Sequence, residues 1–153
     1  MMKILVTGVA GFIGSHTAEY LSILGHTVIG IDNFNPYYDI NLKLKNASAV
    51  KEKGVEVLKL DLRSVDLHTA LPLDFDYIFH YAGQPGILAT STFEDYFSNN
   101  IIATKNLVDF ALKCSNLKLF VNIGTSSIYG LEATFPESVA PKPASHYGVT
   151  KLA

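Results

Sequence analysis

A run of glycines near the N-terminus constrains the fold of this chain more than any other feature. The segment Thr7–Gly14 reads TGVAGFIG and stands between a short apolar run, Lys3–Thr7, and a helical apolar pattern, Phe12–Leu24. Glycines at this spacing let the backbone turn tightly after a strand and let the helix pack closely on that strand. The helix N-terminus then presents free N–H groups and a partial positive charge, which suit phosphates. We predict a phosphate-binding turn; a tight turn without a ligand is the alternative.

Strand and helix patterns alternate along the rest of the chain. The predicted strands are Lys3–Thr7, Thr27–Ile31, Val55–Leu60, Tyr77–Tyr81 and Leu117–Ile123. The predicted helices are Phe12–Leu24, Asn41–Lys53, Ser64–Leu71 and Phe93–Cys114, the last long enough to contain a bend, followed by an irregular loop, Gly130–Ala144, and a helix capped by Ser145. Apolar strands without alternation indicate a parallel sheet covered on both faces. We therefore expect an α/β doubly wound parallel sheet (Rossmann fold) of order 3-2-1-4-5, truncated after the fifth β-α unit, with strand five as an edge.

Composition excludes several classes of function. The 153 residues suit one globular domain, with 48% hydrophobic and 17% charged residues. The net charge is −2 and no basic run occurs, so neither nucleic acid nor an anionic membrane is an expected partner. No bilayer-spanning stretch and no leader pattern are found, which favours a cytoplasmic location. Cys114 should be a packed thiol, His80 should be a hydrogen-bonded structural residue, and the five histidines show no metal-ligand spacing, so no metal is expected.

Two acidic residues end predicted strands. Asp32 ends the second, where a carboxylate can accept hydrogen bonds from the ribose hydroxyls of a dinucleotide. It would repel a 2′-phosphate and no arginine lies beside it, so NAD is favoured over NADP; Asp32-Asn33 is equally a common turn pair, and both interpretations can hold together. Asp61-Leu62 ends the third strand. Its carboxylate could receive an adenine amino group, or Asp61 or Ser64 could simply cap the next helix.

Tyr147 and Lys151 lie four positions apart and share a face if they lie on a helix. A free tyrosine, with a pKa near ~10, is a poor base at neutral pH, and a neighbouring ammonium stabilises the phenolate. The spacing therefore suits a proton-transfer pair. Thr125 begins a hydroxyl-rich segment after the fifth strand, at the sheet edge where ligands bind. Its hydroxyl there could orient a substrate alcohol.

Together these residues resemble the extended short-chain dehydrogenase/reductases, in particular the NAD-dependent sugar epimerase/dehydratase family. The resemblance covers the whole chain. Its matching pieces, in order, are Thr7–Gly14, Asp32, Asp61-Leu62, His80–Gly83, Asn99-Asn100, Thr125–Gly130 and Tyr147–Lys151. It implies that Tyr147 is the catalytic base, that Lys151 tunes it and touches the nicotinamide ribose, and that Thr125 bonds the reacting alcohol. The implied NAD-binding residues are Gly8, Gly11, Phe12, Ile13, Gly14, Asp32, Asn33, Asp61, Leu62, Tyr81, Ala82, Gly83, Asn100, Tyr147 and Lys151.

Within that family, Asp32–Asp39 resembles the loop after strand two of UDP-glucuronate 4-epimerases, and residues 84–86 partly resemble their Gln-Ala-Gly stretch. Pro85, the following residues 87–89, and Gly124, where serine is common, depart from the pattern. The resemblance implies an NAD-dependent nucleotide-sugar 4-epimerase, with UDP-glucuronate the expected substrate and a transient 4-keto sugar as intermediate.

A 4,6-dehydratase or decarboxylase is the alternative enzyme, and a non-catalytic dinucleotide-binding fragment is the alternative of another class. The resemblance implies that dehydratases have an Asp-Glu pair directly after the catalytic threonine, and that decarboxylases have a glutamate there. This chain has Ser126 and Ser127 at these positions. The intact Thr125, Tyr147 and Lys151 argue against binding alone. We expect residues 1–153 to form an incomplete NAD-binding domain without the C-terminal substrate domain, and to have little or no turnover alone. The full-length protein is expected to bind a UDP-sugar and to form a homodimer.

Overall fold

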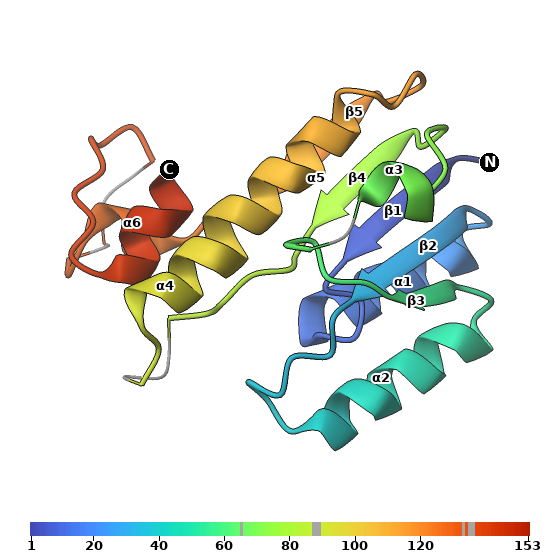
Figure 1. Cartoon of the computed structure of the whole chain (residues 1–153), viewed down its shortest axis with the longest axis horizontal. Coiled ribbons are helices and arrows are strands. Elements are labelled where there is room, and N and C mark those ends of the chain that lie inside the picture. Colours follow the sequence, from blue (N-terminus) through green and yellow to red (C-terminus); the bar gives the residue numbers. More distant parts are fainter. Residues whose placement is uncertain (65, 87–89, 133, 135–136) are drawn as a thin grey trace.

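The computed structural model describes residues 1–64, 66–86, 90–132, 134 and 137–153. Its centre is a parallel sheet of order β3-β2-β1-β4-β5 (Figure 1). The strands are β1 (Lys3–Thr7), β2 (Thr27–Asp32), β3 (Glu56–Lys59), β4 (Tyr77–His80) and β5 (Leu119–Asn122). All four strand pairings are parallel, so the predicted doubly wound order is confirmed.

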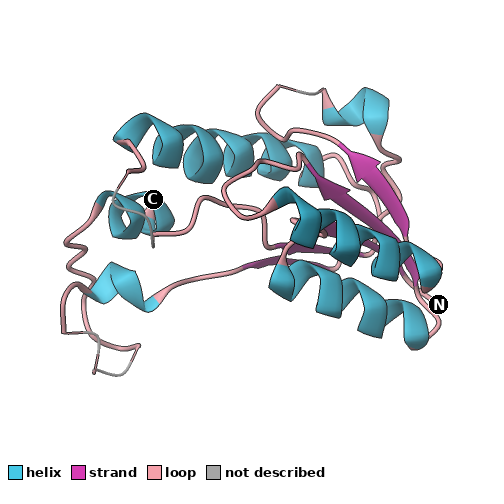
Figure 2. Ribbon diagram, turned by 90° about the horizontal axis from the view of Figure 1, so that it is seen from below, coloured by secondary structure: helices cyan, strands magenta, loops and turns pink. Residues whose placement is uncertain are grey.

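Helices cover the sheet on both sides (Figure 2). The α-helices are α1 (Phe12–Ile23), α2 (Ile40–Glu52), α3 (Leu67–Ala70), α4 (Phe93–Tyr96), α5 (Ala103–Ala111) and α6 (His146–Leu152). A π-helical segment, η1 (Phe97–Ile102), joins α4 to α5, and a short 3₁₀ turn, η2 (Ser126–Tyr129), follows β5. In the described part of the chain, no helix is both long and apolar enough to cross a membrane.

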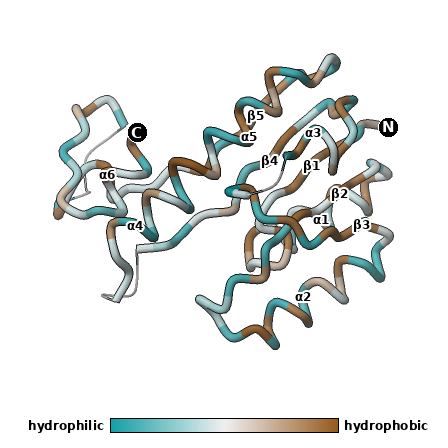
Figure 3. The backbone as a smooth tube through the Cα atoms, viewed as in Figure 1, coloured by the Kyte–Doolittle hydropathy of each residue, from teal (hydrophilic) through white to brown (hydrophobic). Residues whose placement is uncertain are grey.

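Alternate residues of the central strands build two cores. On β1, Ile4 and Val6 pack with Ala18 of α1 and Val50 of α2. Leu5, between them, points to the opposite side and joins the core formed with α3 and α5, whose other members include Ile31, Ile78, Leu107 and Phe110. Each fully buried side chain of this size contributes ~1.5–3 kcal/mol. Figure 3 shows the hydrophobic central strands that result. Cys114 is buried in the second core, as expected of a packed thiol.

The predicted elements differ from the observed ones mainly at their ends. The predicted helix Ser64–Leu71 is helical only over Leu67–Ala70. Its N-cap is Asp66, whose carboxylate accepts the His68 N–H at 3.1 Å. The proposal that Asp61 or Ser64 caps this helix is therefore wrong. Asp66 lies closer to the first helical turn, where a capping oxygen can reach the free N–H groups.

The predicted long helix Phe93–Cys114 is divided into three parts. Thr92 and Asp95 form a reciprocal capping box that starts α4, and α5 carries the core residues of the second half. Between them, η1 has the wider turn of a π-helix, which accommodates one extra residue. The predicted continuous helix is thus interrupted by a π segment, and Asn100 lies within it.

Candidate active site

The carboxyl ends of the strands open into one cavity of about 410 Å³. It contains the glycine turn after β1, the ends of β2, β3 and β4, and the side chains of Tyr147 and Lys151 from α6. Of the sixteen residues predicted for cofactor binding or catalysis, fourteen line this cavity: Gly8, Gly11, Phe12, Ile13, Gly14, Asp32, Asn33, Asp61, Leu62, Tyr81, Ala82, Gly83, Tyr147 and Lys151. Within the described part of the chain, Thr125 and Asn100 are not among the lining residues.

The glycine turn has the geometry of a phosphate cradle. Gly8 adopts a φ of 69° and donates its N–H to the carbonyl of Ile31 at 2.8 Å, which fastens the turn to β2. A Cβ at Gly14 would overlap the Gly8 carbonyl, so α1 approaches the turn as closely as a backbone allows. Gly11 caps α1 without a side-chain hydrogen bond. The N–H groups of the first helical turn are therefore left for a ligand, and the cradle fits a pyrophosphate.

Asp32 is buried at the end of β2 and already has protein partners. Its carboxylate accepts the N–H of Phe34 at 2.7 Å and of Ala10 at 3.2 Å. Lys43 of α2 adds an ion pair, with its ammonium 2.9 Å from Oδ1. The carboxylate lines the cavity beside the glycine turn, where a dinucleotide's ribose would lie. The sequence places no arginine next to Asp32, but the fold brings a positive charge to it from Lys43 of the next helix.

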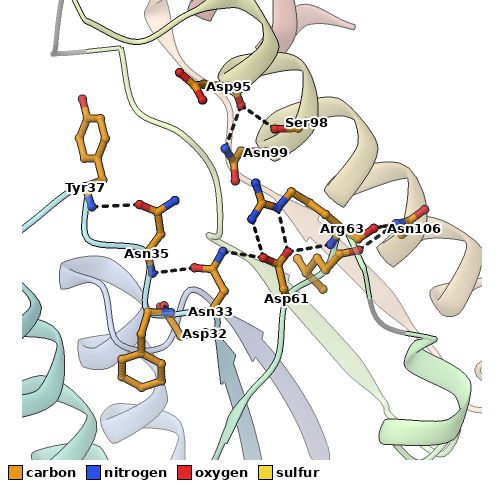
Figure 4. Close-up of polar contacts among 12 residues, drawn as sticks. Asp32, Asn33, Asn35, Tyr37, Asp61, Arg63, Asp95, Ser98, Asn99 and Asn106 are labelled. Atoms are coloured by element: carbon orange, nitrogen blue, oxygen red, sulfur yellow. Dashed lines mark hydrogen bonds and ion pairs between the residues drawn. The ribbon is translucent and has the colours of Figure 1, made fainter.

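Asp61 is held at the end of β3 by four donors (Figure 4). Arg63 supplies three of them: its backbone N–H at 2.9 Å, Nε at 2.9 Å and a terminal guanidinium nitrogen at 2.6 Å. Asn33 donates from Nδ2 at 3.2 Å and so connects the end of β2 to the end of β3. The hydrogen bonds from Arg63 outweigh partial burial and lower the pKa of Asp61 to about 2. Asp61 is thus a fixed, ionised acceptor on the cavity wall.

Tyr147 and Lys151 lie one turn apart on α6, and both reach the cavity. Ser145 caps this helix by accepting the Gly148 N–H at 3.0 Å, which confirms the predicted cap. Burial lowers the pKa of Lys151, and its ammonium makes no hydrogen bond to any described residue. A half-buried ammonium that has no partner among the described residues is suited to a ligand hydroxyl.

His80 lies beneath this pair and is structural, as predicted. Its two ring nitrogens are 2.7 Å from the Thr7 hydroxyl and 2.9 Å from the Thr104 hydroxyl, so it joins β1, β4 and α5. Burial, with a smaller contribution from Lys151, lowers the pKa of His80 to about 4. The imidazole is therefore neutral at physiological pH and adds no charge below Lys151.

Two predicted residues stand beside the cavity. Thr125 accepts the Ser127 N–H at 3.2 Å and begins η2. Asn100 is buried: its amide accepts the Gln84 N–H at 2.7 Å and donates to the Gln84 carbonyl and to the Thr150 hydroxyl, each at 3.2 Å. Asn100 thus connects the loop after β4 to α6. Its assignment to cofactor binding, like that of Thr125 to catalysis, stays a prediction.

The cavity wall also contains Asn35, Tyr37, Tyr38, Lys43, Arg63, Gln84, Pro85 and Asn99. Six of these lie in segments that carry the family resemblance but were given no role, whereas Lys43 and Arg63 were missed altogether. Lys43 gives no local signal, because its contact with Asp32 depends on how α2 packs against α1 and β3. Arg63 did give a local signal. It lies two positions after Asp61, close enough for its guanidinium to donate two hydrogen bonds to that carboxylate. In the described part of the chain, no three metal-ligating side chains lie together. The expected departures at residues 87–89 lie outside the described residues.

The chain belongs to the NAD dependent epimerase/dehydratase family, which it matches over residues 4–153. NAD is the cofactor named by that family, and the cradle, Asp32 and Asp61 fit a dinucleotide. The chain is 42% identical over 156 residues to a Bacillus subtilis protein described as the uncharacterized UDP-glucose epimerase YtcB, covering 99% of this chain and 49% of the relative. It is 35% identical over 158 residues to UDP-glucuronate 4-epimerase 4 of Arabidopsis thaliana, covering 99% of this chain and 36% of the relative.

A solved structure shares the fold closely. The crystal structure of UDP-glucuronic acid 4-epimerase from Bacillus cereus, in complex with UDP-glucuronic acid and NAD, superimposes with a TM-score of 0.87 at 38% identity. The match covers 99% of this chain and 49% of that chain. The present chain therefore spans half or less of the length of the relatives it matches.

Proposed function

We propose that the full-length protein is an NAD-dependent nucleotide-sugar 4-epimerase acting on UDP-glucuronate. The observation that carries this proposal is the meeting of two sites in one cavity: the phosphate cradle of Gly8–Gly14 and the Tyr147–Lys151 pair. A dinucleotide-binding protein without catalysis requires only the first. The names of the relatives support the same activity, since they include both UDP-glucuronate and UDP-glucose epimerases.

The proposed chemistry assigns one task to each residue. The Lys151 ammonium stabilises the phenolate form of Tyr147, which then takes the proton of the sugar 4-hydroxyl and becomes a neutral phenol. Thr125 donates a hydrogen bond to the same sugar oxygen and orients it. NAD, when bound, would accept the hydride from C4 of the sugar and later return it to the same carbon. The transient 4-keto sugar rotates within the site, so that the hydride returns to the opposite face of C4. Tyr147 then gives the proton back to the sugar oxygen, and the configuration at C4 is inverted.

The residues after Thr125 favour epimerisation over dehydration or decarboxylation. A 4,6-dehydratase must also remove the C5 proton and protonate the leaving C6 hydroxyl, which needs further acid–base groups. Ser126 and Ser127 stand in the η2 turn at these positions. A serine hydroxyl is too weak an acid or base for this work unless another group activates it. The reaction should therefore end with return of the hydride.

The test supplies the full-length protein with NAD and, in turn, UDP-glucuronate, UDP-glucose and dTDP-glucose. We expect UDP-galacturonate from the first, identified by chromatography and NMR. A 4-keto-6-deoxy sugar or released carbon dioxide would refute the epimerase assignment, whereas epimerisation of UDP-glucose alone would correct only the substrate. We also propose that residues beyond this chain complete the UDP-sugar site and that the protein is a homodimer, which sedimentation of the same preparation tests.

A further inference from the structure

The loop between β2 and α2 is shaped by its own side chains. Asn33 Oδ1 accepts the N–H of Asn35 at 2.9 Å, and Asn35 Oδ1 accepts the N–H of Tyr37 at 3.0 Å (Figure 4). Asp32 makes the same contact with Phe34, whose φ is 57°. Side chains that bond the backbone two residues on fix a loop without help from a neighbouring element. The place of Tyr37 is thus set by the loop itself.

Tyr37 joins two walls of the cavity. Its hydroxyl donates to the carbonyl of Pro85, 48 positions further along the chain, at 3.2 Å. Both residues line the cavity, Tyr37 from the β2–α2 loop and Pro85 from the loop after β4. The ring of Tyr38 meets the Tyr37 ring edge-on, with centroids 4.9 Å apart. The two loops are therefore connected across the cavity on the side of the catalytic residues.

The segment that Tyr37 holds lies against Tyr147. A Cβ built on Gly86 would be 2.6 Å from Tyr147 Cδ1 and 2.7 Å from its Cγ, so the Gly86 backbone touches the ring. The Tyr96 ring lies near it as well, with centroids 6.1 Å apart. Burial raises the pKa of Tyr38, with smaller contributions from Tyr37 and Tyr147, so the three phenols lie within electrostatic range. Tyr147 is therefore oriented partly by the Pro85-Gly86 backbone.

We infer that Tyr37 is a positioning residue of the active site, which closes the β2–α2 loop across the cofactor cavity and holds the Pro85-Gly86 backbone against the ring of Tyr147. The inference rests on the proposed role of Tyr147 as base. Tyr37 acts through the backbone of another loop and needs no contact with the reacting atoms. Its hydroxyl has two separable effects: it retains bound NAD, and it keeps Tyr147 oriented.

The test compares Tyr37→Phe with a matched control, Tyr20→Phe, in the full-length protein. Tyr20 lies on α1 and is 63% exposed, so loss of its hydroxyl should change nothing. Losing one hydrogen bond of ~1 kcal/mol corresponds to about a fivefold effect. We expect Tyr37→Phe to release NAD about fivefold faster and to lower kcat about fivefold, with KM changed less than twofold. A Tyr37→Phe protein that melts like the wild type and matches it in both NAD release and kcat would overturn the inference.

A second variant keeps the test decisive if Tyr37→Phe fails to fold. Gly86→Ala places a methyl group against the Tyr147 ring and should lower kcat more than tenfold while NAD release stays unchanged. Unchanged kcat would show that this backbone does not position Tyr147. The proposed function fails separately, if the wild type yields no epimer. In that case faster NAD release from Tyr37→Phe would still support loop closure, and unchanged release would refute it.

Discussion

The two ends of the cavity differ in how far the protein satisfies its own polar groups. At the adenosine end, Asp32 accepts three hydrogen bonds and Asp61 accepts four, all from the protein. At the proposed catalytic end, the ammonium of Lys151 has no hydrogen bond to a described residue, and burial lowers its pKa. The proposed anchor for the dinucleotide is therefore assembled in advance, while the proposed reacting groups keep their capacity for a ligand.

This difference separates affinity from chemistry. A carboxylate whose partners are fixed binds a ligand without reorganising, so changes at the adenosine end should alter NAD affinity. Groups whose interactions strengthen in the transition state lower the barrier of the chemical step. Changes at the proposed catalytic end should therefore alter kcat. Three substitutions test whether the cavity divides in this way, and a fourth tests the ion pair that holds Asp61.

The largest effect is expected for Tyr147→Phe. Removing the proposed base should lower kcat ~10²–10⁴-fold, because the proton of the sugar hydroxyl then has no acceptor on the protein. The NAD dissociation constant should rise by no more than about fivefold, which corresponds to one hydrogen bond, since the phosphate cradle stays intact. Steady-state kinetics and calorimetry on the full-length protein measure both. A large loss of NAD affinity with kcat preserved would reverse the comparison.

Gly14→Ala should act at the opposite end. The added methyl would overlap the Gly8 carbonyl, and α1 must then move away from the turn. Overpacking against backbone costs ~1–3 kcal/mol, and we expect the NAD dissociation constant to rise by up to about 100-fold. Gly124→Ala is the control, because its methyl would meet nothing within 4 Å. Equal NAD affinity in the two variants would contradict the close approach of α1 to the phosphates.

Asp32→Ala should weaken NAD binding about tenfold and narrow the preference for NAD over NADP. The loss of two ribose hydrogen bonds accounts for the first effect. The second follows because the Lys43 ammonium, now without its carboxylate, becomes available to a 2′-phosphate. Titration with each cofactor measures both. If the wild type bound NADP more tightly, or if NADP gained nothing from the substitution, the ribose role of Asp32 would be wrong.

The smallest effect is expected from Arg63→Gln, seen in the pH dependence of stability. The pKa of Asp61 is about 2 in the folded protein, below the ordinary 3.8, so ionised Asp61 stabilises the fold above about pH 4. This contribution is lost as the pH falls from about 4 to 2. It amounts to ~1 kcal/mol at most for a partly exposed pair. Urea unfolding from pH 2 to 7 should show a shallower acid limb in Arg63→Gln, and an unchanged limb would mean that Arg63 does not set this pKa.

The sequence predicted those parts of the molecule whose information is local. The strand order follows from the alternation of strands and helices along the chain, joined by right-handed crossovers. The phosphate cradle follows from the glycine spacing within Thr7–Gly14. Tyr147 and Lys151 could be paired because four residues make one helical turn. These are one-dimensional signals that the structure preserves.

Contacts between distant segments could not be predicted in the same way. Lys43 reaches Asp32 only because α2 packs against α1 and β3. Tyr37 meets Pro85 only because the loops that follow β2 and β4, the two strands on either side of β1, leave the sheet at the same edge. The cap of α3 was misplaced because several acidic or hydroxyl residues precede it, and backbone geometry selects Asp66 among them. Periodicity alone leaves such choices open.

The π segment η1 lets a regular spacing of buried residues face two different parts of the molecule. Tyr96, Asn100, Ala103, Leu107 and Phe110 are spaced as one continuous buried stripe, and each is buried. A π turn advances fewer degrees per residue than an α turn, so the stripe rotates as it passes through η1. Its second half consequently faces the sheet core, while Asn100 faces α6 and the loop after β4. One inserted residue thus acts as a phase shift within the helix. It lets one continuous helical segment pack on the sheet core through α5 and bind Thr150 of α6 through Asn100.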